Sequence, residues 1–356
     1  MSRRAHIVGT GGYQPGEPIS NDDLERLVGA LPAQVLDGLG IEQRFWMIDP
    51  ATGGHRESNT DMATEAARRA LADAGVDAAE VDLILLSTGT PEYPLPPTAN
   101  LVQERLGIDR CATLEVRSGG AGWVQCLDIA RLYLTSGMAT TALVIGSEVI
   151  SPVLAPLYLH RDVERIRMRE RIPLYLFGDG AGAAVLTVGD EPGGLLGGAT
   201  CAIGGDRPPG IRSVGGGTHA PLHVQAASPR LVDLQVDVVG AAEVTPRMVT
   251  EAITHGLEAC NVTVDTVDWC LVPEGNAGWM LDALQAAGLS TPEWTKLTGR
   301  VIDSLARTGA VGSAAVPLFL DQARRSGQVR AGQRVLLVGV ESTKWIYAST
   351  VVDLIS

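Results

Sequence analysis

The sequence predicts an α/β protein made of two similar halves, arranged in five layers as α/β/α/β/α. Its 356 residues are 45% hydrophobic and 19% charged, which suffices for two domains or one duplicated fold. Continuous apolar runs between helical patterns indicate parallel strands covered on both faces. A unit of helix, short linker and apolar strand occurs in both halves of the chain. Two stacked βαβ halves account for both the length and the pattern.

A repeated segment supports this duplication. Residues 63–89 and 249–275 share the helix, linker and strand plan, and their matching positions keep one constant spacing. The matches are Thr64-Glu65-Ala66 with Thr250-Glu251-Ala252, and Val81-Asp82 with Val267-Asp268. Residues 141–148 similarly echo residues 334–341. Two βα units can look alike by pattern alone, but the constant spacing favours duplication. We predict an N-terminal half at 1–190, with an insertion at about 151–172, and a C-terminal half at 191–356.

Composition excludes several classes of protein. The net charge of −13 and the pI near 4.9 argue against a nucleic-acid surface, which needs clustered Lys and Arg. No run reaches 18 apolar residues, so we expect no membrane span. Residues 1–12 resemble a strand and a glycine turn rather than a secretory signal, which predicts a cytoplasmic protein. The five cysteines lack metal-ligand spacing and are expected to be reduced and mostly buried.

The segment between the halves has no repeat partner. Residues 158–171 are rich in Arg and Glu with helical spacing, and residues 193–217 are rich in glycine. The first stretch is interpreted as an insertion near the mouth of an active site or a dimer edge, or simply as a solvated helix face. The second is interpreted as the connection into the C-terminal half.

Residues 114–122, L-E-V-R-S-G-G-A-G, are the most informative stretch for function. An apolar run ends there, two glycines follow, and residues 123–133 have an amphipathic helical pattern. A residue on this turn would sit at a helix N-terminus, where backbone N–H groups lower a thiol pKa and favour an oxyanion. Position 120 is glycine, so the turn has the form of a nucleophile turn without the nucleophile.

Three motifs in the expected order give the chain a family resemblance. They are I-V-G-T-G-G-Y-Q-P at 7–15, G-I-E-Q-R at 40–44 and F-G-D-G-A-G-A-A-V-L at 177–186. Together they resemble the beta-ketoacyl-acyl-carrier-protein synthase III family of the thiolase superfamily. The resemblance implies a thiolase-like fold, acyl-coenzyme A or acyl carrier protein as partner, a pantetheine channel, and a homodimer. It implies no bound cofactor.

The family uses a Cys, a His and an Asn for acyl capture and decarboxylative condensation, and this chain departs from all three. An ungapped match over residues 115–137 places Gly120 at the Cys position. V-P-E-G-N-A puts Glu274 in place of His, and T-G-A-V puts Ala310 in place of Asn. The glycine loop that usually supplies an oxyanion donor contains Glu341 and Ser342. Because a carboxylate opposes a developing oxyanion, the ordinary cysteine mechanism is not expected.

Three residues are candidates for replacement catalytic groups. Ser118 is a candidate acyl acceptor on the glycine-flanked turn, although it could instead cap the following helix or hydrogen-bond the turn. Glu274 is a candidate general acid or base whose pKa burial would raise, and the alternative is a carboxylate paired with an Arg. Asn276 could orient a thioester carbonyl, or only fix its own loop.

Four further residues are predicted to line the substrate site: Gly120, His219, Thr308 and Ser342. His219 and His223 are the histidines expected nearest a cavity, with an ordinary loop role as the alternative for each. Their spacing suggests a metal site, but Pro221 between them breaks a helix and no Cys or carboxylate cluster accompanies them. We therefore predict no metal.

Two functions from different classes remain open. The first is an acyltransferase that takes an acyl group from coenzyme A or a carrier protein, through Ser118 or by direct attack with Glu274 as base. The second is a noncatalytic partner subunit or carrier-protein-binding scaffold of a condensing-enzyme complex. Polar rather than apolar residues at 274 and 276 favour the enzyme, whereas loss of the triad favours the scaffold. The resemblance makes polyketide or other secondary metabolism a reasonable setting.

Overall fold

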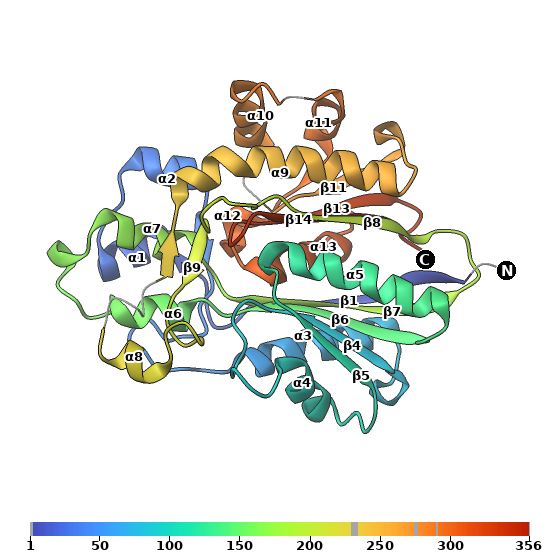
Figure 1. Ribbon diagram of the computed structural model, residues 1–356, viewed down its shortest axis with the longest axis horizontal. Helices are drawn as coiled ribbons and strands as arrows, with labels where there is room; N and C mark the ends of the chain where they lie inside the picture. The colour runs from blue at the N-terminus through green and yellow to red at the C-terminus, as the bar shows by residue number, and fades with distance from the viewer. Residues whose placement is uncertain (1–2, 229–233, 274–276, 290, 356) are drawn as a thin grey trace.

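The computed structural model describes residues 3–228, 234–273, 277–289 and 291–355, and it has five layers (Figure 1). Two five-stranded sheets lie one above the other, with helices between them and on both outer faces. The predicted thiolase-like α/β/α/β/α arrangement is confirmed. The division into halves at residue 190 stays our proposal.

The two sheets share one topology, which shows the duplication directly. The first has the order β1 (Arg4–Tyr13), β7 (Gly180–Gly189), β6 (Thr141–Glu148), β4 (Leu83–Ser87), β5 (Ala112–Val116). The second has the order β8 (Gly194–Ala202), β14 (Ile346–Asp353), β13 (Arg334–Glu341), β11 (Trp269–Leu271), β12 (Val301–Ile302). In each sheet the last three strands run parallel and the first two are antiparallel to their neighbours. β6 and β13 therefore hold equivalent positions.

The helices fill the three remaining layers. The central layer holds α5 (Gly119–Ser136) and α13 (Ala315–Arg325). One outer layer holds α3 (Asn59–Ala74) and α4 (Thr98–Leu106), and the other holds α9 (Val238–Ala259), α10 (Ala277–Ala286) and α11 (Pro292–Leu297). Among the helices that the structure describes, none has the length and apolar character required to cross a bilayer.

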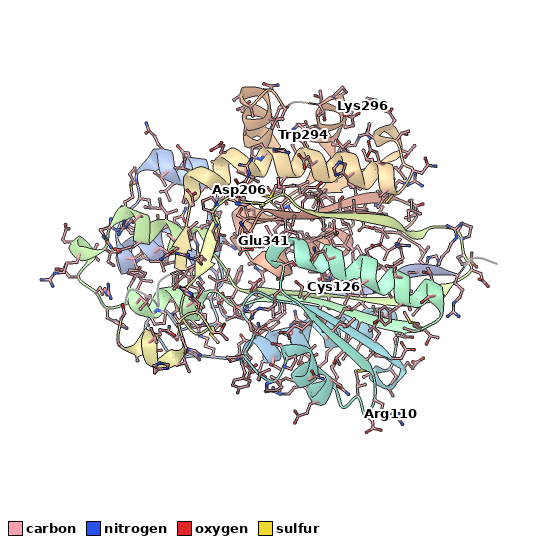
Figure 2. All side chains as sticks on the ribbon, viewed as in Figure 1. Arg110, Cys126, Asp206, Trp294, Lys296 and Glu341 are labelled. Carbon is pink, nitrogen blue, oxygen red and sulfur yellow. The ribbon has the colours of Figure 1, made fainter. Side chains whose placement is uncertain are left out.

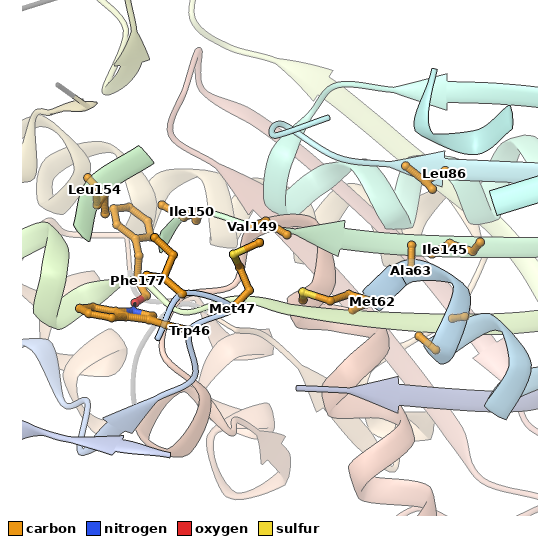
Figure 3. Packing of buried hydrophobic residues seen from close by; sticks show 14 of the residues in the cluster. Trp46, Met47, Met62, Ala63, Leu86, Ile145, Val149, Ile150, Leu154 and Phe177 are labelled. Carbon is orange, nitrogen blue, oxygen red and sulfur yellow. Dashed lines mark hydrogen bonds between the residues drawn. The ribbon is translucent and has the colours of Figure 1, made fainter. Parts of the chain in front are cut away.

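Alternation along the strands produces separate apolar layers. On β4, Ile84 and Leu86 join the cluster under α3, whereas Leu83 and Leu85 join the cluster between the sheets. The first cluster continues from α3 toward Trp46 and Phe177 outside the sheets (Figure 3). Since both faces of β4 are covered, its sequence is continuously apolar.

The glycines of the F-G-D-G-A-G-A motif allow β7 and α13 to pack closely. A Cβ atom added to Gly182 would lie 2.6 Å from the backbone nitrogen of Leu318 on α13. A side chain there would force the helix and the strand apart. This contact fixes α13 against the first sheet.

Shorter elements form a lobe beside the layers. They are α1 (Asn21–Val28), α2 (Ala33–Leu39), α6 (Ser151–Leu154), α7 (Met168–Leu176), α8 (Leu222–Ala226), β9 (Ile211–Ser213) and β10 (Leu234–Val236). The predicted insertion at 151–172 forms α6, two 3-10 turns and the start of α7. Its charged residues pair locally: Arg165 pairs with Asp162 on exposed surface, and the exposed Arg167 pairs with the largely buried Glu170. This pairing favours the solvated-face interpretation of the Arg-rich stretch.

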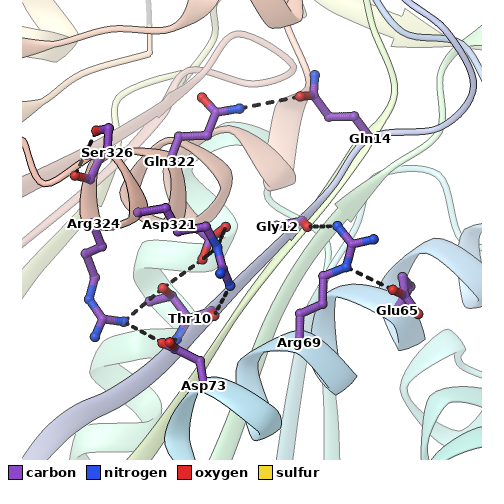
Figure 4. Close-up of polar contacts among 12 residues, drawn as sticks. Thr10, Gly12, Gln14, Glu65, Arg69, Asp73, Asp321, Gln322, Arg324 and Ser326 are labelled. Carbon is purple, nitrogen blue, oxygen red and sulfur yellow. Dashed lines mark hydrogen bonds and ion pairs between the residues drawn. The ribbon is translucent and has the colours of Figure 1, made fainter.

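A buried polar cluster joins β1 to α13 and α3 (Figure 4). The Thr10 hydroxyl donates to Asp321 Oδ1 at 2.9 Å, and Arg325 Nε donates to both Asp321 oxygens. Arg324 donates to Thr10 Oγ1 at 2.8 Å and to Asp73. Asp321 is only 4% exposed, so its carboxylate depends on these donors.

Asp321→Ala is expected to lower the free energy of unfolding by about 2–3 kcal/mol, because Thr10 and Arg325 lose a buried acceptor. Urea denaturation measures the change. Asp265→Ala is the control, since its ion pair with Lys296 is exposed and should contribute less than about 1 kcal/mol. Equal effects of the two substitutions would contradict the assigned role of Asp321.

Candidate active site

β5 and α5 form the strand, turn and helix expected from residues 114–122. β5 ends at Val116, and α5 begins at Gly119 rather than near Gly122. Gly119 has a φ of +43°, a conformation that glycine adopts without strain. The backbone N–H groups of the first helical turn therefore lie directly after the glycine pair, where the positive end of the helix dipole is strongest.

Position 120 has no room for a side chain in this packing. A Cβ atom on Gly120 would overlap the Val340 carbonyl oxygen near the end of β13. A Cβ atom on Gly339 would likewise overlap the Gly120 carbonyl oxygen. The first turn of α5 is thus in backbone contact with β13, and the contact depends on glycine at both positions.

Glu341, the last residue of β13, binds the backbone at this turn. Gly120 N–H donates to Glu341 Oε2 at 2.7 Å, and Thr343 N–H donates to Oε1 at 2.7 Å. The side chain lies at the start of α5 between the sheets (Figure 2), and the residue is 8% exposed. The Gly120 N–H at the start of α5 is therefore already hydrogen-bonded within the protein.

The electrostatics of Glu341 follow from its burial. Burial raises the pKa of Glu341, and the nearby Glu148 carboxylate adds to the rise. The N–H donors of Gly120 and Thr343 oppose that rise. Within the described ranges no Lys or Arg forms an ion pair with either carboxylate. The carboxylate is held by N–H groups and the helix end instead of by a cation.

Glu148 at the end of β6 is a buried carboxylate that the sequence analysis did not single out. It accepts from Gly89 N at 2.9 Å, from Ser313 N at 3.1 Å and from the Thr90 hydroxyl. Burial raises the pKa of Glu148. The Ser313 hydroxyl in turn donates to the Gly119 carbonyl at 3.0 Å. A signal was present, because both echoing segments, 141–148 and 334–341, end in Glu.

Ser118 precedes α5 but does not cap it. It occupies the N-cap position, yet its side chain makes no capping hydrogen bond. The capping alternative is therefore wrong. Ser118 is partly exposed, and across the residues described its hydroxyl has no hydrogen-bond partner. In the described structure the Ser118 hydroxyl is therefore not engaged by the helix or by the turn.

No nearby cysteine substitutes for the missing thiol at this turn, as far as the described residues extend. Cys126 is the cysteine on α5, and it is fully buried in the apolar layer between the sheets. Burial raises its pKa, which keeps the thiol protonated and unreactive. Cys270 on β11 is buried with the same effect.

Asp179 of the F-G-D-G motif organises the backbone beside the site. Its carboxylate accepts from Met47 N at 2.8 Å, Ile150 N at 2.7 Å and Ser151 N at 2.9 Å, and from the Ser151 hydroxyl. The residue is fully buried, and burial raises the pKa of Asp179 to about 6. It joins β7, α6 and the chain after β3 (Gln43–Arg44) at one point.

Comparisons with known proteins agree with this geometry. The family described as 3-Oxoacyl-[acyl-carrier-protein (ACP)] synthase III matches residues 114–204, and its C-terminal region matches residues 257–352. Beta-ketoacyl-[acyl-carrier-protein] synthase III of Neisseria meningitidis is 32% identical over 341 residues, covering 94% of this chain and 95% of the relative. This chain belongs to the 3-oxoacyl-[acyl-carrier-protein] synthase III family.

Solved structures of synthase III relatives share the fold over nearly the whole chain. A tetronic acid condensing enzyme superposes with a TM-score of 0.81 at 30% identity, covering 98% of this chain and 99% of that one. A priming beta-ketosynthase from a polyketide biosynthetic pathway gives 0.80 at 26% identity, covering 100% and 97%. Synthase III from Aquifex aeolicus gives 0.78 at 25% identity, covering 98% and 99%.

The residues predicted to stand at the synthase III triad positions have the following surroundings. Gly120, predicted at the Cys position, is in backbone contact with β13. Ala310 is predicted at the Asn position; its N–H donates to Leu176 O at 2.9 Å and its carbonyl accepts from Gly178 N at 3.1 Å. Its methyl side chain supplies no amide. Glu274 and Asn276 lie outside the described residues, so their roles stay predictions.

The remaining candidate site residues lie in different surroundings. Thr308, at the end of α12 (Leu305–Thr308), is buried and its hydroxyl donates to Ser304 O at 3.1 Å and Gly309 O at 2.9 Å. Ser342 follows Glu341 directly, and its carbonyl accepts from Gly210 N at 3.0 Å. His219 is exposed in the loop between β9 and α8, and His223 is exposed on α8. Their predicted contacts with substrate stay predictions.

Proposed function

We propose that this synthase III relative transfers an acyl group from a coenzyme A or acyl-carrier-protein thioester to an acceptor, with Ser118 as the nucleophile in place of cysteine. Family membership supports the thioester substrate class. The observation that carries the serine assignment is the uncommitted Ser118 hydroxyl at the start of α5, beside a position 120 that admits no side chain.

The chemistry of this proposal has two balanced steps. Ser118 Oγ attacks the thioester carbonyl, a base accepts the hydroxyl proton, and the C–S bond breaks to give a serine ester and a thiol that takes up the proton. The acceptor then attacks the ester carbonyl, the C–O bond to Ser118 breaks, and the proton of the acceptor passes through the base to Ser118 Oγ, which restores the serine. We assign the base to Glu274, which stands at the family's His position, and carbonyl orientation to Asn276.

The test is intact-protein mass measurement after incubation with a panel of acyl-coenzyme A and acyl-carrier-protein substrates. We expect an acyl adduct that is absent in Ser118→Ala, together with a rate loss on the order of a thousandfold or more. Ser136→Ala is the matched control, because Ser136 lies at the far end of α5 and its hydroxyl donates to Tyr133 O. An adduct that persists in Ser118→Ala would contradict the serine route.

Direct attack by the acceptor is the alternative enzymatic route. An unmodified protein that still transfers acyl groups, and loses rate in Glu274→Gln, would favour it. Either enzymatic outcome keeps the family's substrate class and changes only the covalent step.

A noncatalytic partner subunit is the second candidate function. It is favoured by the contact between Glu341 and Gly120, which occupies a donor that synthase chemistry uses. No turnover, together with tight association with a condensing enzyme that retains its Cys, would establish this function instead.

We also propose a metabolic role and an oligomeric state for this chain. One structural relative is a tetronic acid condensing enzyme and another is a priming beta-ketosynthase from a polyketide biosynthetic pathway, which supports secondary metabolism for this chain. We propose a homodimer in the cytoplasm. β5 lies at the edge of the first sheet, and its Leu114 is exposed, so this edge is available for pairing.

A further inference from the structure

The contact between Glu341 and α5 has a counterpart in the other half of the molecule. Glu148 ends β6 and accepts the N–H of Ser313, while Glu341 ends β13 and accepts the N–H of Gly120. β6 and β13 hold equivalent places in their sheets. Ser313 begins the approach to α13, and Gly120 lies in the first turn of α5. In each half, the side-chain carboxylate at the end of the strand thus binds the start of the central helix of the other half.

The backbone geometry repeats as closely as the hydrogen bonds do. Gly119 and Gly312 precede the two N–H donors and have φ values of +43° and +46°. A Cβ atom on Gly119 would overlap Glu341 Oε2, and one on Gly312 would overlap Glu148 Oε2. The same spacing along the chain separates the glycines and the glutamates. We call each contact, Glu341 with Gly120 N–H and Glu148 with Ser313 N–H, a carboxylate cap. The two caps are copies of one arrangement related by the duplication.

The strand glycines complete the correspondence. A Cβ atom on Gly146 of β6 would overlap the Ser313 carbonyl oxygen, and one on Gly339 of β13 would overlap the Gly120 carbonyl oxygen. The ends of β6 and β13 are therefore in backbone contact with the starts of α13 and α5, respectively. The halves differ in that Ser313 keeps a side chain, whereas position 120 is bare.

We infer that the Glu341 carboxylate occupies the position at Gly120 N–H where a substrate carbonyl would bind. Glu148 binds the N–H of Ser313 in the equivalent way. The carboxylate supplies the negative oxygen that a thioester carbonyl would otherwise present to this N–H. Substrate carbonyls therefore do not reach Gly120 N–H while Glu341 is in place. This inference does not depend on Ser118 being the nucleophile.

Removing the carboxylate should create a site for a small carboxylate. In Glu341→Gly the N–H groups of Gly120 and Thr343 face an empty space, and formate is the probe for it. We expect the melting temperature to fall by several degrees and to recover with millimolar formate, but not with chloride at equal ionic strength. Glu148→Gly should behave alike, because Ser313 and Gly89 lose the same kind of acceptor. A fall without formate recovery in either variant would overturn the equivalence.

Competition with acetyl-coenzyme A tests the carbonyl position separately. Formate should weaken acetyl-coenzyme A binding to Glu341→Gly severalfold by calorimetry, and leave binding to the wild type and Glu148→Gly unchanged. Formate could restore the melting temperature of Glu341→Gly without weakening acetyl-coenzyme A binding. Glu341 would then lie outside the position of the substrate carbonyl, and the inference would be overturned.

A conservative variant covers the case in which Glu341→Gly fails to fold. Glu341→Gln fills the same space, and its amide oxygen can accept only one of the two N–H groups. We expect a smaller fall in melting temperature and no response to formate. If formate and chloride at equal ionic strength have the same effect on the melting temperature of Glu341→Gln, the inference is supported. If formate raises this melting temperature and chloride does not, the inference is contradicted. Loss of acylation in Ser118→Ala affects none of these readouts.

Discussion

Asp179→Ala is expected to lower the free energy of unfolding by about 3–5 kcal/mol. The substitution leaves three buried N–H groups and the Ser151 hydroxyl without their acceptor, and these groups come from two segments, the chain after β3 and the start of α6. Although burial raises the pKa of Asp179 to about 6, the carboxylate is ionised at pH 8 and accepts all four bonds there. Urea denaturation at pH 8 measures the loss.

Two further substitutions delimit the Asp179 prediction. Asp179→Asn keeps one oxygen but turns an NH₂ group toward backbone donors, so it should also destabilise the protein. Asp190→Ala is the control, since Asp190 is exposed after β7 and should change stability by about 0.5 kcal/mol or less. A stable Asp179→Ala protein would mean that water replaces the carboxylate at this point.

Gly120→Cys is expected to destabilise the protein, and the new thiol is expected not to act as a catalytic nucleophile. The new Cβ atom would overlap the Val340 carbonyl oxygen, so α5 and β13 must separate. Overpacking of this kind costs about 1–3 kcal/mol, and here it involves backbone rather than a flexible side chain. The thiol would also lack an amide partner at Ala310, the residue predicted to stand at the family's Asn position. Thermal melting and iodoacetamide labelling measure the two effects.

Ser118→Cys is the matched control for that substitution. Position 118 is partly exposed and already carries a side chain, so a thiol fits there. We expect this variant to fold normally, to react with iodoacetamide and to take up an acyl group from a thioester. A Gly120→Cys protein that is equally stable and equally reactive would show that the packing at position 120 is not restrictive.

Much of the fold follows from local pattern. The apolar run on β4 is continuous because both of its faces are covered, and the same pattern recurs at β11 in the second half. The constant spacing between the repeats predicted the two equivalent sheets. The start of α5 was misplaced toward Gly122, because a glycine pair reads as a turn by sequence although Gly119 and Gly120 both lie within the helix.

The candidate site was predictable in part. The loss of the thiol at position 120 is visible in the sequence, and so is a carboxylate in the last glycine loop. The sequence also left Ser118 with two roles, capping or catalysis, and only the structure removed the capping role. Glu148 was predictable only by comparison with Glu341 at the end of the echoing segment, because one Glu at a strand end does not by itself indicate a buried site.

The sequence by itself determined the duplicated layers, the strand and helix at 114–122, and the absence of Cys and Asn at positions 120 and 310. Only the tertiary structure decided that Glu341 occupies the N–H of Gly120 and that Glu148 does the same at Ser313. The reason is physical. Periodicity records which face of an element is buried, whereas these contacts join residues far apart in the chain, and their geometry is fixed by how the two halves stack.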